Sequence, residues 1–97
     1  MGSRPRKRIW HPRIHSDVTD EVEKRSPAER LVFYAVVEQL LQDPFDRTLG
    51  VRPVTAIHRP RIFSVPIQDN EDLYGFLTYE IYRDHPVVHL FWVRFFN

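Results

Sequence analysis

The sequence contains no cysteine, and only three of its 97 residues are glycine. The missing thiols exclude a disulfide scaffold, a thiolate zinc site and a cysteine nucleophile. The glycines are scattered, so neither a phosphate-binding loop nor a dinucleotide-binding motif is present. No apolar run approaches the roughly 18–20 residues of a membrane span, and none follows the basic N-terminus as in a secretory signal. We therefore expect a cytoplasmic protein without a membrane partner.

Charge is unevenly distributed along the chain. The first fifteen residues carry five bases and no acid, whereas the rest carry nine bases and thirteen acids. Since 97 residues suffice for one domain, we predict a flexible basic arm over residues 1–7 and a single domain over residues 8–97. The arm either lies free in solvent or contacts phosphates or an acidic partner. Its candidate RNA-binding residues are Arg4, Arg6, Lys7 and Arg8.

Two helices are predicted in the first half of the chain. Ser16 is a suitable N-cap for a short helix that runs to about Arg25 and has a thin apolar stripe. The segment Ser26-Pro27-Ala28-Glu29 has the sequence of a capping box with proline at the first helical position. A second helix therefore runs from Pro27 to about Gln42. Asp43-Pro44 ends it, because a residue before proline avoids the helical conformation.

The second helix carries a wide apolar stripe, so we expect it to lie on a sheet and to bury much of its circumference. The residues of the stripe are Leu31, Phe33, either Tyr34 or Ala35, Val37, Leu40 and Leu41.

Beyond Pro53 the apolar period changes to two, and β-branched and aromatic residues become frequent. We predict strands near Ile62–Ile67, Tyr74–Tyr82 and Val87–Phe95, and a first strand near Arg8–His11 that Pro12 ends or places at a sheet edge. On the last strand, Val88, Leu90 and Trp92 are expected on one face, opposite a second apolar face. That strand should therefore lie inside the sheet or be covered on its second side. Most strand aromatics are expected in the core.

Separate blocks of helices and strands indicate an α+β fold, with the helices on one face of an antiparallel or mixed sheet. The residues of the C-terminal segment are more specific. They are Tyr74-Gly75-Phe76-Leu77-Thr78-Tyr79-Glu80-Ile81-Tyr82, the turn Arg83-Asp84-His85-Pro86, and Val87-Val88-His89-Leu90-Phe91-Trp92-Val93-Arg94. This segment resembles the RelE/ParE superfamily of toxins from toxin–antitoxin pairs. The resemblance implies two N-terminal helices packed on a small sheet with a C-terminal three-strand meander.

The resemblance also implies an activity. The ribonuclease members of that family cut messenger RNA in the ribosome by attack of the ribose 2′-hydroxyl on the adjacent phosphate, without a metal or other cofactor. Such chemistry needs cations for the developing phosphorane and groups that exchange protons. On this basis the candidate catalytic residues are His58, Arg61 and Arg94, and further candidate RNA contacts are Arg59 and Arg83. His85 and His89 are weaker candidates for proton exchange. In the alternative interpretation, Arg59 and Arg61 are solvent-exposed charges that protect an edge strand from pairing and have no role in a site.

Two features of the sequence depart from the family pattern. Gly75 stands where many members have an arginine, and no tyrosine or histidine follows Arg94. The resemblance thus implies a ribosome-dependent endoribonuclease, with a DNA gyrase poison or an inactive binding module that uses the basic arm as alternatives. The implied partners are a cognate antitoxin, in a hetero-oligomer, and either the ribosome with its mRNA or gyrase. The histidines lack metal-ligand spacing, so we expect no metal site.

Overall fold

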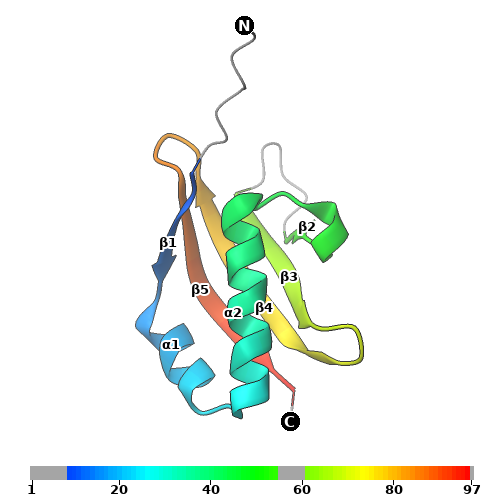
Figure 1. The fold of residues 1–97 in the computed structure, drawn as a ribbon. Helices are drawn as coiled ribbons and strands as arrows, with labels where there is room; N and C mark the ends of the chain where they lie inside the picture. The colour runs from blue at the N-terminus through cyan, green and yellow to red at the C-terminus, as the bar shows by residue number, and fades with distance from the viewer. Residues whose placement is uncertain (1–8, 55–60, 97) are drawn as a thin grey trace, which may run out of the picture.

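Two helices pack on one face of a five-stranded mixed sheet (Figure 1). The computed structural model describes residues 9–54 and 61–96, so the predicted arm lies outside the described residues. Its elements are β1 (His11–Ile14), α1 (Ser16–Glu23), α2 (Pro27–Gln42), the 3-10 helix η1 (Arg47–Leu49), β2 (Arg52–Pro53), β3 (Ile62–Gln68), β4 (Leu73–Tyr82) and β5 (Val87–Phe95). The predicted α+β class and the C-terminal meander β3–β4–β5 are confirmed. Neither helix in this part of the chain has the length and apolarity needed to cross a membrane.

The strand order in the sheet is β1-β5-β4-β3-β2. β1 pairs with β5 in parallel, and the other pairs are antiparallel. β5 therefore has a neighbour on each side, as its apolar faces predicted. β1 begins at His11 rather than at Arg8, and it continues through Pro12. It lies at the sheet edge, where a residue without a backbone N–H is tolerated.

Side chains cap both helices at their N-termini. In α2 the Glu29 amide donates to Ser26 Oγ at 3.3 Å, and the Ser26 amide donates to Glu29 Oε1 at 3.4 Å, which confirms the predicted capping box. In α1 the prediction of Ser16 as the cap is wrong. The cap is His15, whose Nδ1 accepts the amide N–H of Asp17 at 3.1 Å. An imidazole nitrogen thus serves in place of the usual hydroxyl or carboxylate.

Replacing Ser26 with alanine is expected to lower the free energy of unfolding by about 1 kcal/mol, because the Glu29 amide loses its capping acceptor, Ser26 Oγ. Ser16→Ala is the matched control, since Ser16 caps nothing, and it should change stability by less than about 0.5 kcal/mol. Urea unfolding of both variants checks this. Equal effects would contradict the assignment of the two caps.

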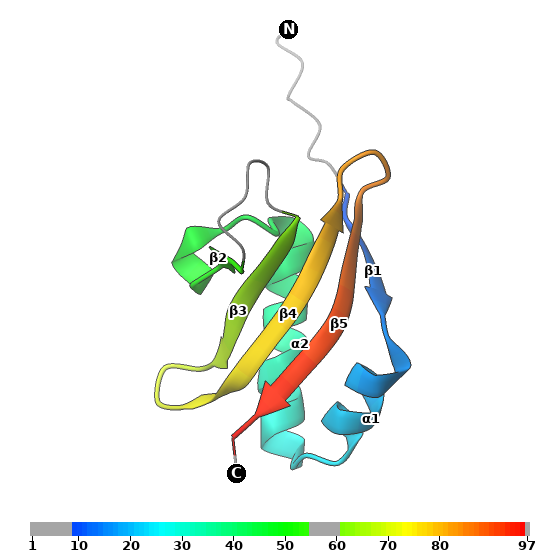
Figure 2. The same ribbon diagram turned by 180° about the vertical axis from the view of Figure 1, so that it is seen from behind.

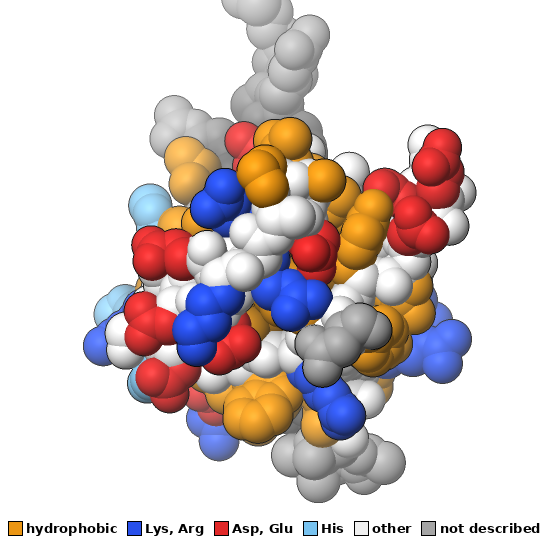
Figure 3. All heavy atoms as spheres, turned by 90° about the horizontal axis from the view of Figure 1, so that it is seen from below, with side chains coloured by type: hydrophobic (Ala, Val, Ile, Leu, Met, Phe, Trp, Pro, Cys, Tyr) orange, Lys and Arg blue, Asp and Glu red, His pale blue; other side chains and the backbone are white. Residues whose placement is uncertain are grey.

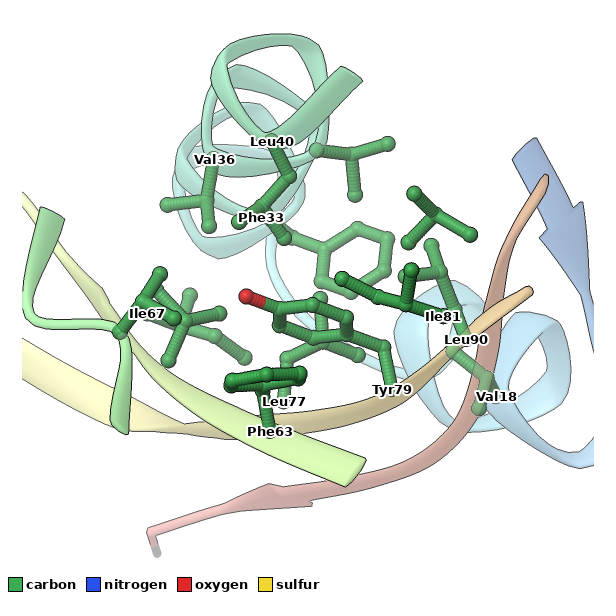
Figure 4. Close-up of a cluster of buried hydrophobic side chains, with 14 of the residues drawn as sticks. Val18, Phe33, Val36, Leu40, Phe63, Ile67, Leu77, Tyr79, Ile81 and Leu90 are labelled. Carbon is green, nitrogen blue, oxygen red and sulfur yellow. The ribbon is translucent and has the colours of Figure 1, made fainter. Parts of the chain in front are cut away.

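The core lies between α2 and the sheet (Figure 4). Its largest fully buried side chain is Tyr79, whose hydroxyl donates to the carbonyl oxygen of Pro44 at 2.7 Å. Burial raises the pKa of Tyr79.

The apolar stripe predicted on α2 was too wide: Leu31 is 73% exposed and Tyr34 is 47% exposed. At 100° per residue Leu31 lies on the side of α2 opposite to the sheet, and Tyr34 lies on its flank. The residues of α2 that are buried are Phe33, Val36, Val37 and Leu40.

A β-bulge in β5 changes which side chains face the helices. Tyr79 pairs with Leu90 and Thr78 pairs with Trp92, so Phe91 is an extra residue on β5. The alternation of faces is reversed beyond this point. Trp92 is 59% exposed, and the prediction that it shares the buried face of Leu90 is wrong. Val93 packs against the core instead.

Candidate nucleic-acid interface

The sheet face opposite the helices is uncovered by any element of the described chain (Figure 2). We call it the open face. Its residues alternate with the buried residues of each strand. They are His11 and Arg13 on β1, Val87, His89, Trp92 and Arg94 on β5, Phe76, Thr78, Glu80 and Tyr82 on β4, and Ile62, Ser64 and Pro66 on β3.

One end of the open face presents aromatic rings beside a cation. Phe76 is 39% exposed and pairs across the strands with Arg94. The ring of Phe96 meets that of Phe76 edge to face at a centroid distance of 5.8 Å, and Trp92 lies two residues before Arg94. The expectation that most strand aromatics lie in the core therefore fails at this end. Exposed rings next to an arginine are a surface on which single-stranded bases can stack.

The open face does not bring the two predicted catalytic arginines together. The carbonyl oxygen of Arg61 accepts the backbone N–H of Ile81 at 2.8 Å, whereas Arg94 is opposite Phe76. Five positions of β4 separate Ile81 from Phe76, about 17 Å at roughly 3.4 Å per residue. Both arginines are exposed. The two arginines therefore lie near opposite ends of the sheet.

The remaining predicted site residues either lie away from the open face or lie outside the described residues. Arg83 lies in the turn between β4 and β5, with its guanidinium carbon 5.3 Å from the ring centroid of Phe45. Phe45 follows α2, so Arg83 reaches toward the helical layer. The predicted catalytic His58 and the predicted RNA contact Arg59 lie outside the described residues, as do Arg4, Arg6, Lys7 and Arg8.

A group of proton-exchanging side chains lies at the end of the open face away from Arg94. Glu80 pairs across the strands with His89, and the Tyr82 hydroxyl donates to Glu80 Oε1 at 2.6 Å. The ring of Tyr82 stacks on that of His89, with centroids 6.4 Å apart and an interplanar angle of 30°. We call Glu80, Tyr82 and His89 the cross-strand cluster. Arg13 is the partner of His89 on β1.

The hydrogen bond to Glu80 raises the pKa of Tyr82, while the positive charges of Arg13 and Arg61 oppose this rise. Both cations therefore lie close enough to act on the cluster. From the sequence, His89 is a weak candidate for proton exchange, and Glu80 and Tyr82 are not candidates for it. The signal that could have found them is the four-residue turn, because a hairpin around residues 83–86 sets Tyr82 opposite Val87 and Glu80 opposite His89.

The two ends of the open face also differ in charge. Seen from the end where the chain leaves β5, acidic side chains gather over the β3–β4 turn, which carries Asp69, Glu71 and Asp72 (Figure 3). The backbone amides of Asp72 and Glu71 and the hydroxyl of Tyr74 donate to Asp69 and lower its pKa. This turn is next to the Arg94 end. Within residues 9–54 and 61–96, no three His, Asp or Glu side chains lie together as metal ligands.

Solved structures share this fold. The chain is similar to a structure of the archaeal RelE–RelB complex from Pyrococcus horikoshii OT3, with a TM-score of 0.73 and 13% identity over 91% of this chain and 96% of the other. It is also similar to a structure of a mutant of the E. coli toxin RelE in the free state, with a TM-score of 0.67 and 14% identity over 89% and 82% of the two chains. No family model and no curated protein sequence matches. These similarities confirm the fold that the resemblance of residues 74–94 implied.

Proposed function

We propose that this protein is the toxin of a type II toxin–antitoxin pair and that it inhibits growth as a metal-independent, ribosome-dependent mRNA endoribonuclease. The observation that carries the proposal is the open face, which in a fold shared with RelE presents cations and stacking rings on an uncovered sheet. Both arginines that the sequence singled out are exposed: Arg94 lies on the open face, and Arg61 lies directly before β3. A guanidinium keeps its charge throughout a reaction and binds two phosphate oxygens at once.

The separation of these arginines fits a single strand of RNA laid along the open face. One arginine is near the reacting phosphate, and the other anchors a phosphate further along the strand. The exposed rings of Trp92 and Phe76 lie beside Arg94 and accept bases by stacking. An anchor and a stacking surface position the substrate, and positioning contributes a large part of the rate of such reactions.

The proposed protein partner is a cognate antitoxin that covers the open face. Neutralising Arg61 and Arg94 requires acidic side chains, so the antitoxin segment over the open face should be acidic. We expect a small gene beside this one that encodes a DNA-binding protein with an acidic or amphipathic tail. A structure of the complex that leaves both arginines exposed would contradict this mode of inhibition.

Deleting residues 2–8 tests the contribution of the basic arm. The arm has four basic residues, Arg4, Arg6, Lys7 and Arg8, within this range. If each contacts a phosphate, the deletion should make the slope of log affinity for single-stranded RNA against log salt shallower by up to about 3, at about 0.7 per contact. Cleavage of bound RNA should continue. Fluorescence titrations over a range of salt concentrations measure the slope, and an unchanged slope would show that the arm lies free in solvent.

The proposed reaction is tested in a cell-free translation mixture that contains purified protein, ribosomes and one defined mRNA. We expect new 5′ ends within the ribosome-covered segment, and none when ribosomes are omitted. Poisoning of gyrase is the second candidate, because Phe95 and Phe96, which directly follow Arg94, carry no group that exchanges protons. Intact mRNA, together with protein-stabilised breaks in supercoiled DNA when gyrase is added, would favour that alternative.

A further inference from the structure

We propose that the cross-strand cluster of Glu80, Tyr82 and His89 is the proton-transfer site at which a phosphodiester of single-stranded RNA is cleaved. This inference rests on the proposed endoribonuclease function and assigns its chemistry to the end of the open face away from Arg94. His58, the proton-transfer group predicted from the sequence, lies outside the described residues.

The cluster and the neighbouring Arg13 place a carboxylate, an imidazole and a cation side by side. Arg13 on β1 pairs with His89 on β5, and His89 pairs with Glu80 on β4. These three side chains form one row across three adjacent strands of the open face. Neighbouring strands lie about 4.8 Å apart, so one phosphodiester group can reach all three side chains. Glu80 and His89 are half-buried rather than fully solvated, which limits the positions they can take.

The Arg94 end of the open face lacks these groups. The described histidines, His11, His15, His85 and His89, all lie at the other end or beside it: His11 pairs with Val87, His15 has its ring 6.5 Å from that of His89, and His85 is in the β4–β5 turn. The Arg94 end therefore suits binding, and the cluster end suits proton transfer.

The reaction at the cluster conserves all atoms and needs no co-reactant. The Glu80 carboxylate takes the proton of the ribose 2′-hydroxyl, and the 2′-oxygen forms a bond to phosphorus. The bond from phosphorus to the 5′-oxygen of the next nucleotide breaks, and the His89 imidazolium gives its proton to that oxygen. The products are a 2′,3′-cyclic phosphate and a free 5′-hydroxyl. Arg13 and Arg61 offset the charge that develops on the phosphate oxygens.

Tyr82 is a positioning residue in this scheme. Its hydroxyl occupies Glu80 Oε1 and leaves Oε2 for the 2′-hydroxyl, and its ring supports the imidazole of His89. The charged and titratable groups that face His89 are Arg13 from β1, His15 at the start of α1, and Glu80 and Tyr82 from β4, with Arg61 next to Tyr82.

The test is single-turnover cleavage of the defined mRNA on ribosomes by wild type, Glu80→Gln and His89→Gln over a range of pH. Each variant should cleave about 10²–10⁴ times more slowly, the usual contribution of one proton-transfer group. The wild-type rate should fall on both sides of a pH maximum. Glu80→Gln should lose the acid limb and His89→Gln the alkaline limb. Tyr82→Phe should cost less, roughly ten-fold.

Glu38→Gln is the matched control, because Glu38 is an exposed carboxylate on the helical side of the molecule, and its rate should equal that of wild type. Circular dichroism and thermal melts show whether each variant is folded. Glu80→Gln keeps the shape of the side chain and an acceptor for Tyr82, so it tests the site even if His89→Gln unfolds. Folded Glu80→Gln that cleaves at the wild-type rate with an unchanged pH profile would overturn the assignment of the cluster, while the proposed function would stand. Wild type that cleaves no mRNA would overturn both.

Discussion

Replacing Arg61 with alanine is expected to lower the turnover number for mRNA cleavage by about 10²–10³, the usual cost of losing one preorganised charge donor at a reacting centre. Arg61 lies at the cluster end of the sheet, where its carbonyl oxygen accepts the backbone N–H of Ile81, the residue before Tyr82, and the proposed site places its charge near the phosphorane. Arg94→Ala should behave differently. Arg94 lies about 17 Å away along β4, and its loss should raise KM by roughly 10- to 100-fold with little change in turnover number.

Arg47→Ala is the control for both variants, because Arg47 is an exposed arginine of η1, outside the sheet. It should leave both kinetic constants unchanged. Steady-state cleavage measurements on ribosomes separate the two effects. If Arg94→Ala lowered the turnover number and Arg61→Ala only raised KM, the reacting phosphate would lie at the aromatic end of the open face.

Replacing Leu40 with aspartate is expected to lower the free energy of unfolding by roughly 3 kcal/mol or more. Leu40 is fully buried between α2 and the sheet. An aspartate there leaves a charge without a partner in the apolar core, and a small domain has only about 5–15 kcal/mol of stability in total. The variant should therefore be largely unfolded, or unfold at a much lower concentration of urea.

Leu31→Asp is the matched control, since it makes the same change on the same helix at a side chain that is 73% exposed. Its cost should stay below about 1 kcal/mol, which covers the lower helix propensity of aspartate. Urea unfolding of the two variants under identical conditions compares them. Similar losses of stability would contradict the orientation of α2 on the sheet.

Local signals in the sequence predicted most of the fold. The capping box at Ser26 fixed the start of α2 to the residue, because side chain and backbone satisfy each other within one turn. The cap of α1 was assigned to the wrong residue because a histidine nitrogen is seldom used as a cap. The bulge at Phe91 has no local signature, since both residues beside it fit an ordinary strand. One inserted residue moved Trp92 from the expected core to the open face.

The sequence predicts less about the site than about the fold, for a physical reason. Arg61 and Arg94 were chosen as residue types that bind phosphate, but residue type says nothing about distance, and the strand register places them near opposite ends of the sheet. The cross-strand cluster depends on pairing between strands. Glu80 and His89 are nine positions apart in sequence, and only the hairpin register makes them neighbours.

Induced expression of the isolated protein in a bacterial culture, with growth and mRNA integrity followed together in the same samples, tests the central claim most directly. We predict that growth stops and that new mRNA 5′ ends accumulate inside coding sequences within minutes of induction. The Glu80→Gln protein, made at the same level, should allow growth and leave mRNA intact. Arrested growth with intact mRNA, or unaffected growth with abundant folded wild-type protein, would contradict the claim that this fold cuts messenger RNA.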